Sequence, residues 1–529
     1  FEEHIIRAYL SHFTSHLNIS WEKFIGLGRF NPNDTSEEFS MSVLAANLSQ
    51  EINGVSRIHG KVSRDMFQKL YPGYYSEELH IGYVTNGVHY YTWTDSLWQK
   101  VYQKTFGKEF VFDQANDKPW QNIYNLPDSE VWKIRQTVKE TMIKKVKAKL
   151  KADLTFRQEN PKQIISSLEA LNKETLIIGF ARRFATYKRA HLLFTNLDRL
   201  DIIVNNKERP VIFIFAGKAH PADGAGQDLI KRIVEISRMP QFTGKILFLE
   251  NYNMTIGKLL TSGVDVWLNT PTRPLEASGT SGEKAIMNGV LNFSVLDGWW
   301  AEGYKQGAGW AIEEAKTYLN QKLQDELDSE IIYNSFETEI TDAYYNVNKN
   351  GVPEAWISHI KNTIAKITPH FTMQRMLNDY YNKYYHKLEE SGKTFTADNF
   401  EHAKVLAQWK WKILSAWDKI SVEKLVIPDS DTEPIDFGKH FIAEVELKIP
   451  GLNIEDIGVE IIAGNRTNGD IDEIKYRLPL IQGKFIEDIA HFTIEFPLKQ
   501  PGVYDYAFRI YPKHKLLVNR MDFPLVKWI

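Results

Sequence analysis

Residues 175–190 read TLIIGFARRFATYKRA, a short apolar run followed directly by four basic side chains. An unbroken apolar run of this length is typical of a strand that is buried on both faces of a sheet. Four similar runs follow along the chain: PVIFIFAG (210–217), KILFLEN (245–251), VDVWLNT (264–270) and VLNFSVLDG (290–298). The five runs predict the strands of a parallel sheet.

The segments between these runs have helical character, for example YKRAHLLFTNLDRL (187–200) and GQDLIKRIVEIS (226–237). Strands that alternate with helices predict an α/β fold in which helices cover both faces of the sheet. In such sheets ligands bind beyond the carboxyl ends of the strands. The residues that directly follow each run are therefore the candidates for function.

The rest of the chain divides by pattern. Residues 1–95 read as helices followed by an extended segment, residues 96–170 as lysine-rich helices, and residues 310–425 as helix again. After about residue 430 the runs become short and alternating, as in FIAEVELKI (441–449) and VYDYAFRIY (503–511). This alternation predicts a small β-sandwich over residues 430–529.

Composition excludes several classes of protein. The chain has 529 residues, which at roughly 150 residues per domain predicts two to four domains. A net charge of −3 indicates no broad field for nucleic acid or a membrane. The absence of cysteine excludes disulfides, thiolate metal sites and a cysteine nucleophile. No apolar run reaches the roughly 20 residues that span a bilayer, and we expect a cytoplasmic protein.

The first run is followed by a basic cluster of Arg182, Arg183, Lys188 and Arg189 at a predicted strand-to-helix turn. The guanidinium fork matches phosphate oxygens, and a helix N-terminus adds partial positive charge. A solvated basic turn is the alternative. The position at the end of a strand favours a phosphate site.

The second and third runs give weaker signals. Lys218 and His220 follow the second run and are candidates for the same crevice, although a lone histidine is more often structural. Tyr252 follows the third run as a candidate aromatic platform, with a core tyrosine as the favoured alternative.

The fourth run leads into EASGTSGEKAIMNG (276–289). Gly279 and Gly282 permit a tight turn and close approach of a ligand. Thr280 and Ser281 supply hydroxyl and N–H groups at the coming helix start, which has the form of an anion nest. Glu276 stands just ahead, where a carboxylate would accept hydrogen bonds from sugar hydroxyls.

Lys284 is predicted in the first turn of that helix, where a cation opposes the helix dipole. Partial burial among other cations should lower the pKa of its amine and make it nucleophilic toward an aldehyde. This predicts a Schiff base to pyridoxal phosphate, although glycine-rich loops with a lysine are common. The two anion-binding clusters would then hold one cofactor phosphate and one substrate phosphate.

Six motifs occur in order: NGVSRIHGKVSR (53–64), GYVTNGVHYYTW (82–93), GFARRFATYKRA (179–190), FLENYNM (248–254), DVWLNTPTRPLEASGTSGEK (265–284) and LDGWW (296–300). Together they resemble the α-glucan phosphorylases, pyridoxal-phosphate enzymes that degrade glycogen, starch and maltodextrins. The resemblance covers about residues 35–305 and is closest to the short bacterial and archaeal branch.

The resemblance implies a two-lobed glycosyltransferase-B fold with the active site between Rossmann-like lobes. Residues 1–95 would end the N-terminal lobe, residues 96–425 would form the C-terminal lobe that binds pyridoxal phosphate, and residues 430–529 would be an immunoglobulin-like β-sandwich. A packing role for the sandwich is favoured over glucan or subunit binding.

The resemblance also implies the site residues. Lys284 would form the Schiff base, with Trp93 and Tyr252 packed near the cofactor. The cofactor phosphate would be held by Lys188, Thr280 and Ser281. Arg183 would bind the substrate phosphate, with Arg182 close to it. Hydroxyls of the transferred glucose would be held by Asn86, Glu276, Ser278 and Gly279.

The implied reaction is the phosphorolysis of an α-1,4-glucan at its non-reducing end, giving α-glucose 1-phosphate with retained configuration. The cofactor's phosphate, with a pKa near 6, would act as acid and base. Arg183 and Lys188 would hold two phosphate anions together against their repulsion. The implied partners are the glucan and inorganic phosphate or glucose 1-phosphate, with no nucleic acid and no membrane. The resemblance leaves open whether the protein forms a homo-oligomer.

Two departures from the family pattern stand out. Glu283 occupies the position before Lys284 where methionine is common, and it is expected to alter cofactor affinity or to face solvent. The chain begins at Phe1, so most of the first lobe and a glucose-contacting histidine are expected upstream. We expect this chain to bind cofactor but to catalyse poorly or not at all.

Two rival functions are weighed. A glycogen synthase-like nucleotide-sugar glucosyltransferase would place a second glutamate eight residues after Glu276, but that residue is Lys284. A non-catalytic glucan-binding protein would suit the 14 Trp and 24 Tyr residues. It has no need for cations at successive strand ends, so the phosphorylase is favoured.

Overall fold

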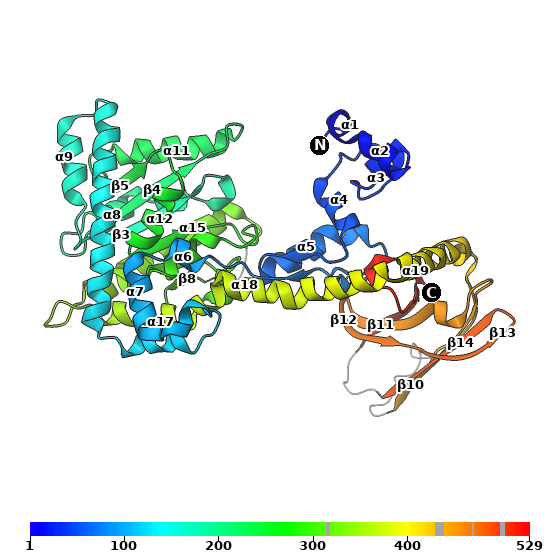
Figure 1. Cartoon of the computed structure of the whole chain (residues 1–529). Helices are drawn as coiled ribbons and strands as arrows, with labels where there is room; N and C mark the ends of the chain where they lie inside the picture. Colours follow the sequence, from blue (N-terminus) through cyan, green and yellow to red (C-terminus); the bar gives the residue numbers. More distant parts are fainter. Residues whose placement is uncertain (314–317, 429–438, 468–469, 498–502) are drawn as a thin grey trace. The chain divides into compact units, whose positions relative to one another are not determined.

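The computed structural model describes residues 1–313, 318–428, 439–467, 470–497 and 503–529. The chain divides into two compact units (Figure 1). The sheet unit comprises Asn53–Val62 and Tyr83–Tyr381. The sandwich unit comprises Phe1–Ile52, Ser63–Gly82 and Asn382–Ile529.

A six-stranded parallel sheet forms the centre of the sheet unit, in the order β5-β4-β3-β6-β7-β8. Its strands are β3 (Leu176–Arg183), β4 (Val211–Lys218), β5 (Ile246–Leu249), β6 (Val266–Asn269), β7 (Leu291–Val295) and β8 (Trp310–Ile312). The five predicted strands are confirmed. The prediction of helix from residue 310 was wrong at β8, because three residues at a sheet edge are too few to give a recognisable apolar run.

Helices and one-turn segments surround this sheet. They include α6 (Tyr90–Trp93), α7 (Ser96–Phe106), α8 (Asp128–Phe156), α9 (Pro161–Ala170), α10 (Leu197–Val204), α11 (Gly224–Ser237), α12 (Met254–Gly263), α13 (Thr280–Ile286), α14 (Trp300–Gly303), α15 (Gln321–Ser335), α16 (Thr341–Tyr345), α17 (Glu354–Lys366) and α18 (Met373–Tyr380). The long helix α8 and the helix α11 are labelled in Figure 1.

The helix expected directly after β3 was partly wrong. Only two 3-10 turns, Thr186–Lys188 and Leu192–Phe194, precede α10, which begins at Leu197. Arg189 has a left-handed backbone, with φ of 47°, and a left-handed residue cannot continue a right-handed helix. Asn196 then caps α10 by accepting the Arg199 N–H at 3.0 Å.

Alternate residues of the strands enter two separate cores. On one face, side chains such as Ile177, Ile212 and Trp267 pack with α8 and α12. On the other face of the sheet, side chains such as Phe180 and Phe213 pack with α10, α11 and α15. Burial on both faces explains why the strands are apolar throughout and do not alternate.

The strand order contains a switch point. From β3 the chain moves to β4 and β5 on one side, and it then returns to place β6 on the other side of β3. The strand order therefore changes direction between β3 and β6, and in open α/β sheets ligands bind at the carboxyl edge beside such a switch point.

The sandwich unit contains two antiparallel four-stranded sheets. One sheet has β9 (Ser421–Val426), β10 (His440–Lys448), β13 (Ile481–Ile486) and β14 (Ile489–Pro497); the other has β11 (Ile457–Thr467), β12 (Asp470–Pro479), β15 (Asp505–Pro512) and β16 (Lys527–Trp528). Inward residues of both sheets form one core with the end of α19 (His386–Ala416). The first strand begins before residue 430, and residues 429–438 lie outside the described residues.

Contacts within this unit tie the sandwich to the segment Ser63–Gly82. Arg509 on β15 donates to Glu78 Oε2 at 2.8 Å and to Glu460 Oε1 at 2.7 Å. Met521 packs in one cluster with Tyr71 and Tyr74. These buried contacts support a packing role for the sandwich.

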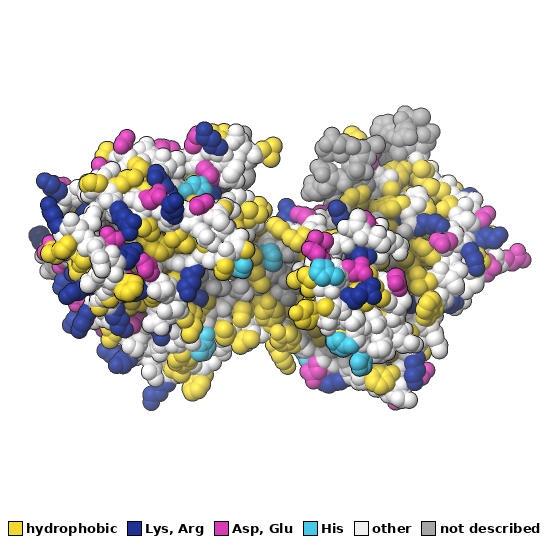
Figure 2. Space-filling model, turned by 90° about the horizontal axis from the view of Figure 1, so that it is seen from above, with side chains coloured by type: hydrophobic (Ala, Val, Ile, Leu, Met, Phe, Trp, Pro, Cys, Tyr) yellow, Lys and Arg dark blue, Asp and Glu magenta, His cyan; other side chains and the backbone are white. Residues whose placement is uncertain are grey.

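The surface in Figure 2 carries Lys and Arg side chains that are interrupted by apolar, neutral and acidic ones. In the described part of the chain, every helix is too short or too polar to cross a membrane.

Candidate active site

The residues that follow β3 and β6 meet at the switch point. Arg182 Nη2 donates to Glu276 Oε2 at 2.7 Å, and Lys188 Nζ donates to the same oxygen. All three side chains are about nine-tenths buried, with exposed fractions of 9%, 9% and 11%. The structure thus brings two of the four predicted cations, Arg182 and Lys188, to the predicted sugar-binding carboxylate, which lies 94 and 88 residues further along the chain.

Arg182 keeps unused hydrogen-bonding capacity. Its Nε and Nη1 are buried and have no partner among the described residues. A buried guanidinium with free donors is suited to bind an anion, because a buried donor without a hydrogen-bond partner costs free energy. Its charge also reaches Tyr252: burial raises the pKa of that phenol, and Arg182 partly offsets the rise. Arg183, the next residue, is exposed.

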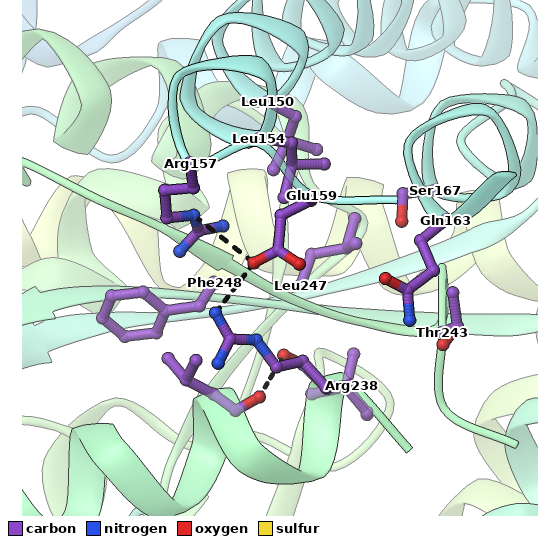
Figure 3. Close-up of a pocket in the computed structure, with 13 residues that line it drawn as sticks. Leu150, Leu154, Arg157, Glu159, Gln163, Ser167, Arg238, Thr243, Leu247 and Phe248 are labelled. Atoms are coloured by element: carbon purple, nitrogen blue, oxygen red, sulfur yellow. Dashed lines mark hydrogen bonds and ion pairs between the residues drawn. The ribbon is translucent and has the colours of Figure 1, made fainter. Parts of the chain in front are cut away.

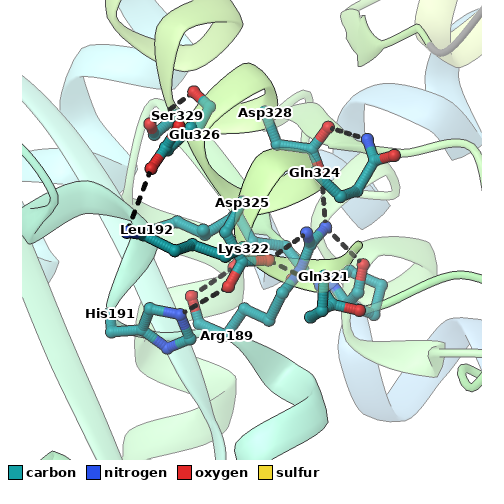
Figure 4. Close-up of polar contacts among 12 residues, drawn as sticks. Arg189, His191, Leu192, Gln321, Lys322, Gln324, Asp325, Glu326, Asp328 and Ser329 are labelled. Carbon is teal, nitrogen blue, oxygen red and sulfur yellow. Dashed lines mark hydrogen bonds and ion pairs between the residues drawn. The ribbon is translucent and has the colours of Figure 1, made fainter. Parts of the chain in front are cut away.

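Arg189 does not join this cluster, so its prediction as a phosphate ligand was wrong. Its guanidinium pairs with Asp325 Oδ1 at 2.9 Å and with Asp328 Oδ2 at 2.6 Å, and it donates to the Thr270 and Pro271 carbonyls (Figure 4). Its left-handed backbone turns the side chain toward α15. Arg189 therefore anchors the loop after β6 to α15.

The loop that carries Glu276 is hydrogen-bonded to the loop after β7. Asp297 Oδ2 accepts the Glu276 N–H at 2.9 Å, and the Trp299 N–H donates to the Ser278 carbonyl at 2.9 Å. Burial raises the pKa of Asp297 to about 6. Asp297 was not singled out from the sequence, although it lies in the quoted motif LDGWW.

The predicted anion nest begins at Gly279, which has a φ of 83° and is the N-cap of α13 without a side-chain cap. The first N–H groups of a helix have no intrahelical partner, so those of Thr280 and Ser281 are available to a ligand. A Cβ on Gly282 would lie 2.6 Å from Asn292 Oδ1, so glycine is required there. Ser281 Oγ accepts from Trp267 Nε1 at 3.0 Å, which fixes its hydroxyl at the sheet.

Lys284 lies in the last turn of α13 and not in the first. A cation in that turn agrees with the helix dipole, so the expected conflict was wrong. Its Nζ lies 3.9 Å from the centroid of the Trp93 ring. Burial lowers the pKa of the Lys284 amine, as predicted, but the neighbouring charge is Glu283, which acts in the opposite direction. Desolvation, and not a group of cations, therefore lowers the pKa of this amine.

Glu283 is fully buried, so the expectation that it faces solvent was wrong. Neither carboxyl oxygen has a hydrogen-bond partner among the described residues. Burial raises the pKa of Glu283 to about 8, partly offset by the charges of Arg375 and Lys284. The carboxyl is therefore mostly protonated at neutral pH.

This burial predicts a specific pH dependence of stability. Between the unfolded pKa and about pH 8 the folded protein retains a proton that the unfolded chain has lost, so the Glu283 contribution falls as pH rises through this window. We expect Glu283→Gln to raise the free energy of unfolding at pH 8 by roughly 2–4 kcal/mol and by much less at pH 5. Urea unfolding of both chains at the two pH values measures the difference. The exposed Glu208→Gln should show no such pH trend, and a pH-independent effect of Glu283→Gln would contradict the assignment.

Asn86 is positioned by its backbone. Its N–H donates to the Val55 carbonyl at 3.1 Å, and its carbonyl accepts from Arg375 Nη2 at 2.9 Å. The adjacent Val88 exchanges two backbone hydrogen bonds of 2.9 Å with residues 371 and 373. The side chain of Asn86 is half-buried. Arg375 was not predicted, because nothing in its own sequence neighbourhood marks this contact.

Lys218 and His220 do not join the cluster of Arg182, Lys188 and Glu276. Lys218 is exposed at the end of β4. His220 Nδ1 accepts the Ala222 N–H at 3.1 Å within its own turn.

A pocket also lies away from these residues, between α8, α9, α11 and β5 (Figure 3). Glu159 stands between Arg157 and Arg238, and Arg238 Nη2 donates to Glu159 Oε1 at 2.7 Å. Arg157 is also paired, with Glu250. The charged side chains of this pocket are thus paired with one another or with Glu250. None of the predicted site residues lines the pocket.

Fold and site together define a class: α/β proteins with buried cations and a carboxylate gathered at the carboxyl edge of a parallel sheet. A family model described as carbohydrate phosphorylase matches residues 4–308. A second model, described as the glycogen phosphorylase C-terminal domain, matches residues 417–529. The chain belongs to the carbohydrate phosphorylase family.

Several curated proteins are similar to this chain. Maltodextrin phosphorylase of Thermococcus litoralis is 35% identical over 521 residues, covering 96% of this chain and 58% of that protein. Glycogen phosphorylase of Aquifex aeolicus is 42% identical over 375 residues, covering 71% and 53%. Glycogen phosphorylase of Mycobacterium tuberculosis is 32% identical over 520 residues, covering 96% and 58%. The chain therefore spans a little over half the length of these relatives.

Proposed function

We propose that the complete protein is an α-1,4-glucan phosphorylase, a hexosyltransferase that uses inorganic phosphate to release α-glucose 1-phosphate. The observation that carries this proposal is the half-buried Lys284 amine, 3.9 Å from the Trp93 ring, in the same unit as the Arg182–Lys188–Glu276 cluster. The names of the three relatives, two glycogen phosphorylases and a maltodextrin phosphorylase, point the same way.

The residues present fit pyridoxal phosphate. An amine with a lowered pKa suits an aldehyde, and an indole ring beside it suits a flat heterocycle. The buried Lys188 ammonium and the uncapped start of α13 suit a phosphate. In this proposal Lys284 holds the cofactor with Trp93 and Tyr252 beside it. Its phosphate would be bound by Lys188 and by the first N–H groups of α13. When bound, the cofactor supplies a phosphate group that can exchange a proton near neutral pH.

The protein's own residues would then divide the remaining work. Arg183, exposed at the end of β3, would bind the substrate phosphate, with Arg182 beside it. Asn86, Glu276, Ser278 and Gly279 would orient the transferred glucose through its hydroxyls. Ser278 supports this role, because its Oγ is buried without a partner among the described residues. Glu276 would leave its two cations or share them as these anions arrive.

The finer architecture is also part of this proposal. Residues 96–425 would be the C-terminal Rossmann-like lobe of a glycosyltransferase-B fold, residues 1–95 the end of the first lobe, and residues 430–529 an immunoglobulin-like sandwich. The switch point between β3 and β6 supports the Rossmann-like assignment.

A phosphate-dependent assay tests the function. The complete protein, loaded with pyridoxal phosphate, is incubated with maltodextrin with and without inorganic phosphate, and glucose 1-phosphate is measured. We expect glucose 1-phosphate only when phosphate is present. Transfer of glucose from a nucleotide sugar would instead support a synthase, and glucan binding without either reaction would support a binding protein.

A further inference from the structure

The placement of Trp93 beside Lys284 requires an explanation. Trp93 ends α6, a helix of only four residues, which has no intrinsic stability as an isolated turn. The ring lies over the Lys284 amine, yet the two residues are 191 positions apart in sequence and belong to different elements. Some contact must fix the end of α6 against α13.

Asn288 makes that contact. Its Nδ2 donates to the Trp93 carbonyl and to the Lys284 carbonyl, both at 2.9 Å. Its Oδ1 accepts the Asp95 N–H at 2.6 Å. The fully buried Asn288 amide thus joins the backbones of Trp93 and Lys284 through its two N–H donors, and its oxygen accepts from a third residue, Asp95.

Asn288 is itself held in place. Its carbonyl accepts from Arg135 Nη1 at 3.1 Å, and the same nitrogen donates to the Ser262 carbonyl at 2.7 Å. Arg135 is buried on α8. The adjacent Met287 carbonyl accepts from Tyr102 on α7 at 3.0 Å. The amide therefore has one orientation available, and its position is set by two other helices.

We propose that Asn288 is a positioning residue that holds the Trp93 ring over the Lys284 amine and so keeps this amine desolvated and reactive. The inference rests on the proposed function only for the identity of the cofactor, since the contact with the amine belongs to this chain alone. A plain structural role would affect stability without acting through Trp93.

The proposal predicts the direction of change at Lys284. Burial lowers the pKa of this amine, and the Glu283 carboxyl, when ionised, acts on that pKa in the opposite direction. Loss of the Asn288 bridge frees the end of α6, so water reaches the amine and its pKa returns toward the ordinary lysine range. At a fixed neutral pH the fraction of reactive neutral amine then falls.

The test compares the wild-type complete protein with Asn288→Asp, which keeps the shape and removes the two donors. Asn288→Ser is a milder second variant. Lys284 reactivity is measured as the rate of labelling by pyridoxal phosphate with borohydride and, separately, by a small acylating reagent, with peptide mapping across pH. We expect labelling at neutral pH to slow by about tenfold, with the midpoint of its pH profile shifted upward.

Two comparisons decide between positioning and plain stability. In a Trp93→Leu background Asn288→Asp should have little further effect on labelling, since coupled residues are non-additive. Gln99→Leu is the matched control: it removes donors to the Tyr91 and Thr94 carbonyls of the same segment without contacting α13. It should leave Lys284 labelling unchanged.

Wild-type labelling in both Asn288 variants would overturn the proposal. So would an equal slowing in the Trp93→Leu background, or an equal effect of Gln99→Leu. The acylating reagent separates this outcome from a failure of the proposed function. If pyridoxal phosphate does not label Lys284 in the wild type, the acylating reagent still reports whether Asn288 controls the amine.

Discussion

Lys284→Arg is expected to abolish covalent retention of pyridoxal phosphate and to lower phosphorolysis by the complete protein by on the order of 10³-fold or more. Arginine preserves the positive charge and the stacking on Trp93. Its guanidinium stays protonated in proteins, so it cannot react with an aldehyde as a neutral amine does. Cofactor retained after dialysis and glucose 1-phosphate formed are the two quantities to measure.

Lys218→Arg is the matched control for this change. Lys218 ends the neighbouring strand β4 and is exposed, so its replacement should alter neither quantity. Unfolding of the Lys284→Arg protein should match the wild type, since Lys284 makes no ion pair among the described residues. Full cofactor retention by Lys284→Arg would show that another residue holds it.

Arg189→Met is expected to lower the free energy of unfolding by about 3–5 kcal/mol. The guanidinium is 2% exposed and pairs with Asp325 and with Asp328, which is fully buried. Methionine preserves the stem but leaves the buried Asp328 carboxylate without its Arg189 counter-charge, and it removes the donors to the loop after β6. Urea unfolding of the full chain, followed by a signal from the sheet unit, measures the loss in the free energy of unfolding.

Arg199→Met provides the comparison. Arg199 pairs with Glu330 and Glu337, but its side chain is 26% exposed and both acids are also accessible to solvent. Solvent-exposed ion pairs contribute about 0–1 kcal/mol, so this substitution should change stability little. Equal losses from the two variants would contradict the structural role assigned to Arg189.

Much of the sheet unit could be predicted from the sequence. Five strands were recognisable because burial on both faces requires unbroken apolar runs, and their ends located Arg182, Lys188 and Glu276. The structure brings these three into one cluster, as the strand-end rule implies. The switch point itself requires the strand order, which no local pattern contains.

Side-chain direction could not be predicted in the same way. Arg189 was grouped with its neighbours by proximity in sequence, but a left-handed backbone turns it into another cluster. The sequence left two alternatives for Glu283, beside the cofactor or in solvent, and the structure excludes solvent because the residue is fully buried. Its burial follows from the packing of α13, whose seven residues have too little length to show a clear helical period.

The residues that support the site were the hardest to predict. Asn288, Arg375 and Asp297 act through hydrogen bonds to backbone groups of distant segments. Such hydrogen bonds depend only on where two backbone segments meet in the fold. They produce no periodicity and no motif in the amino-acid sequence. Asn288 lies in the quoted stretch EASGTSGEKAIMNG, but only the structure shows that its amide reaches Trp93.

Reductive trapping tests the central claim most directly. The chain is incubated with pyridoxal phosphate, reduced with borohydride and digested, and the modified peptide is identified by mass spectrometry. We expect modification chiefly at Lys284 in this chain and in the complete protein. Absence of selective modification at Lys284 in the complete protein would contradict the assignment of the cofactor site, and with it the proposed phosphorylase.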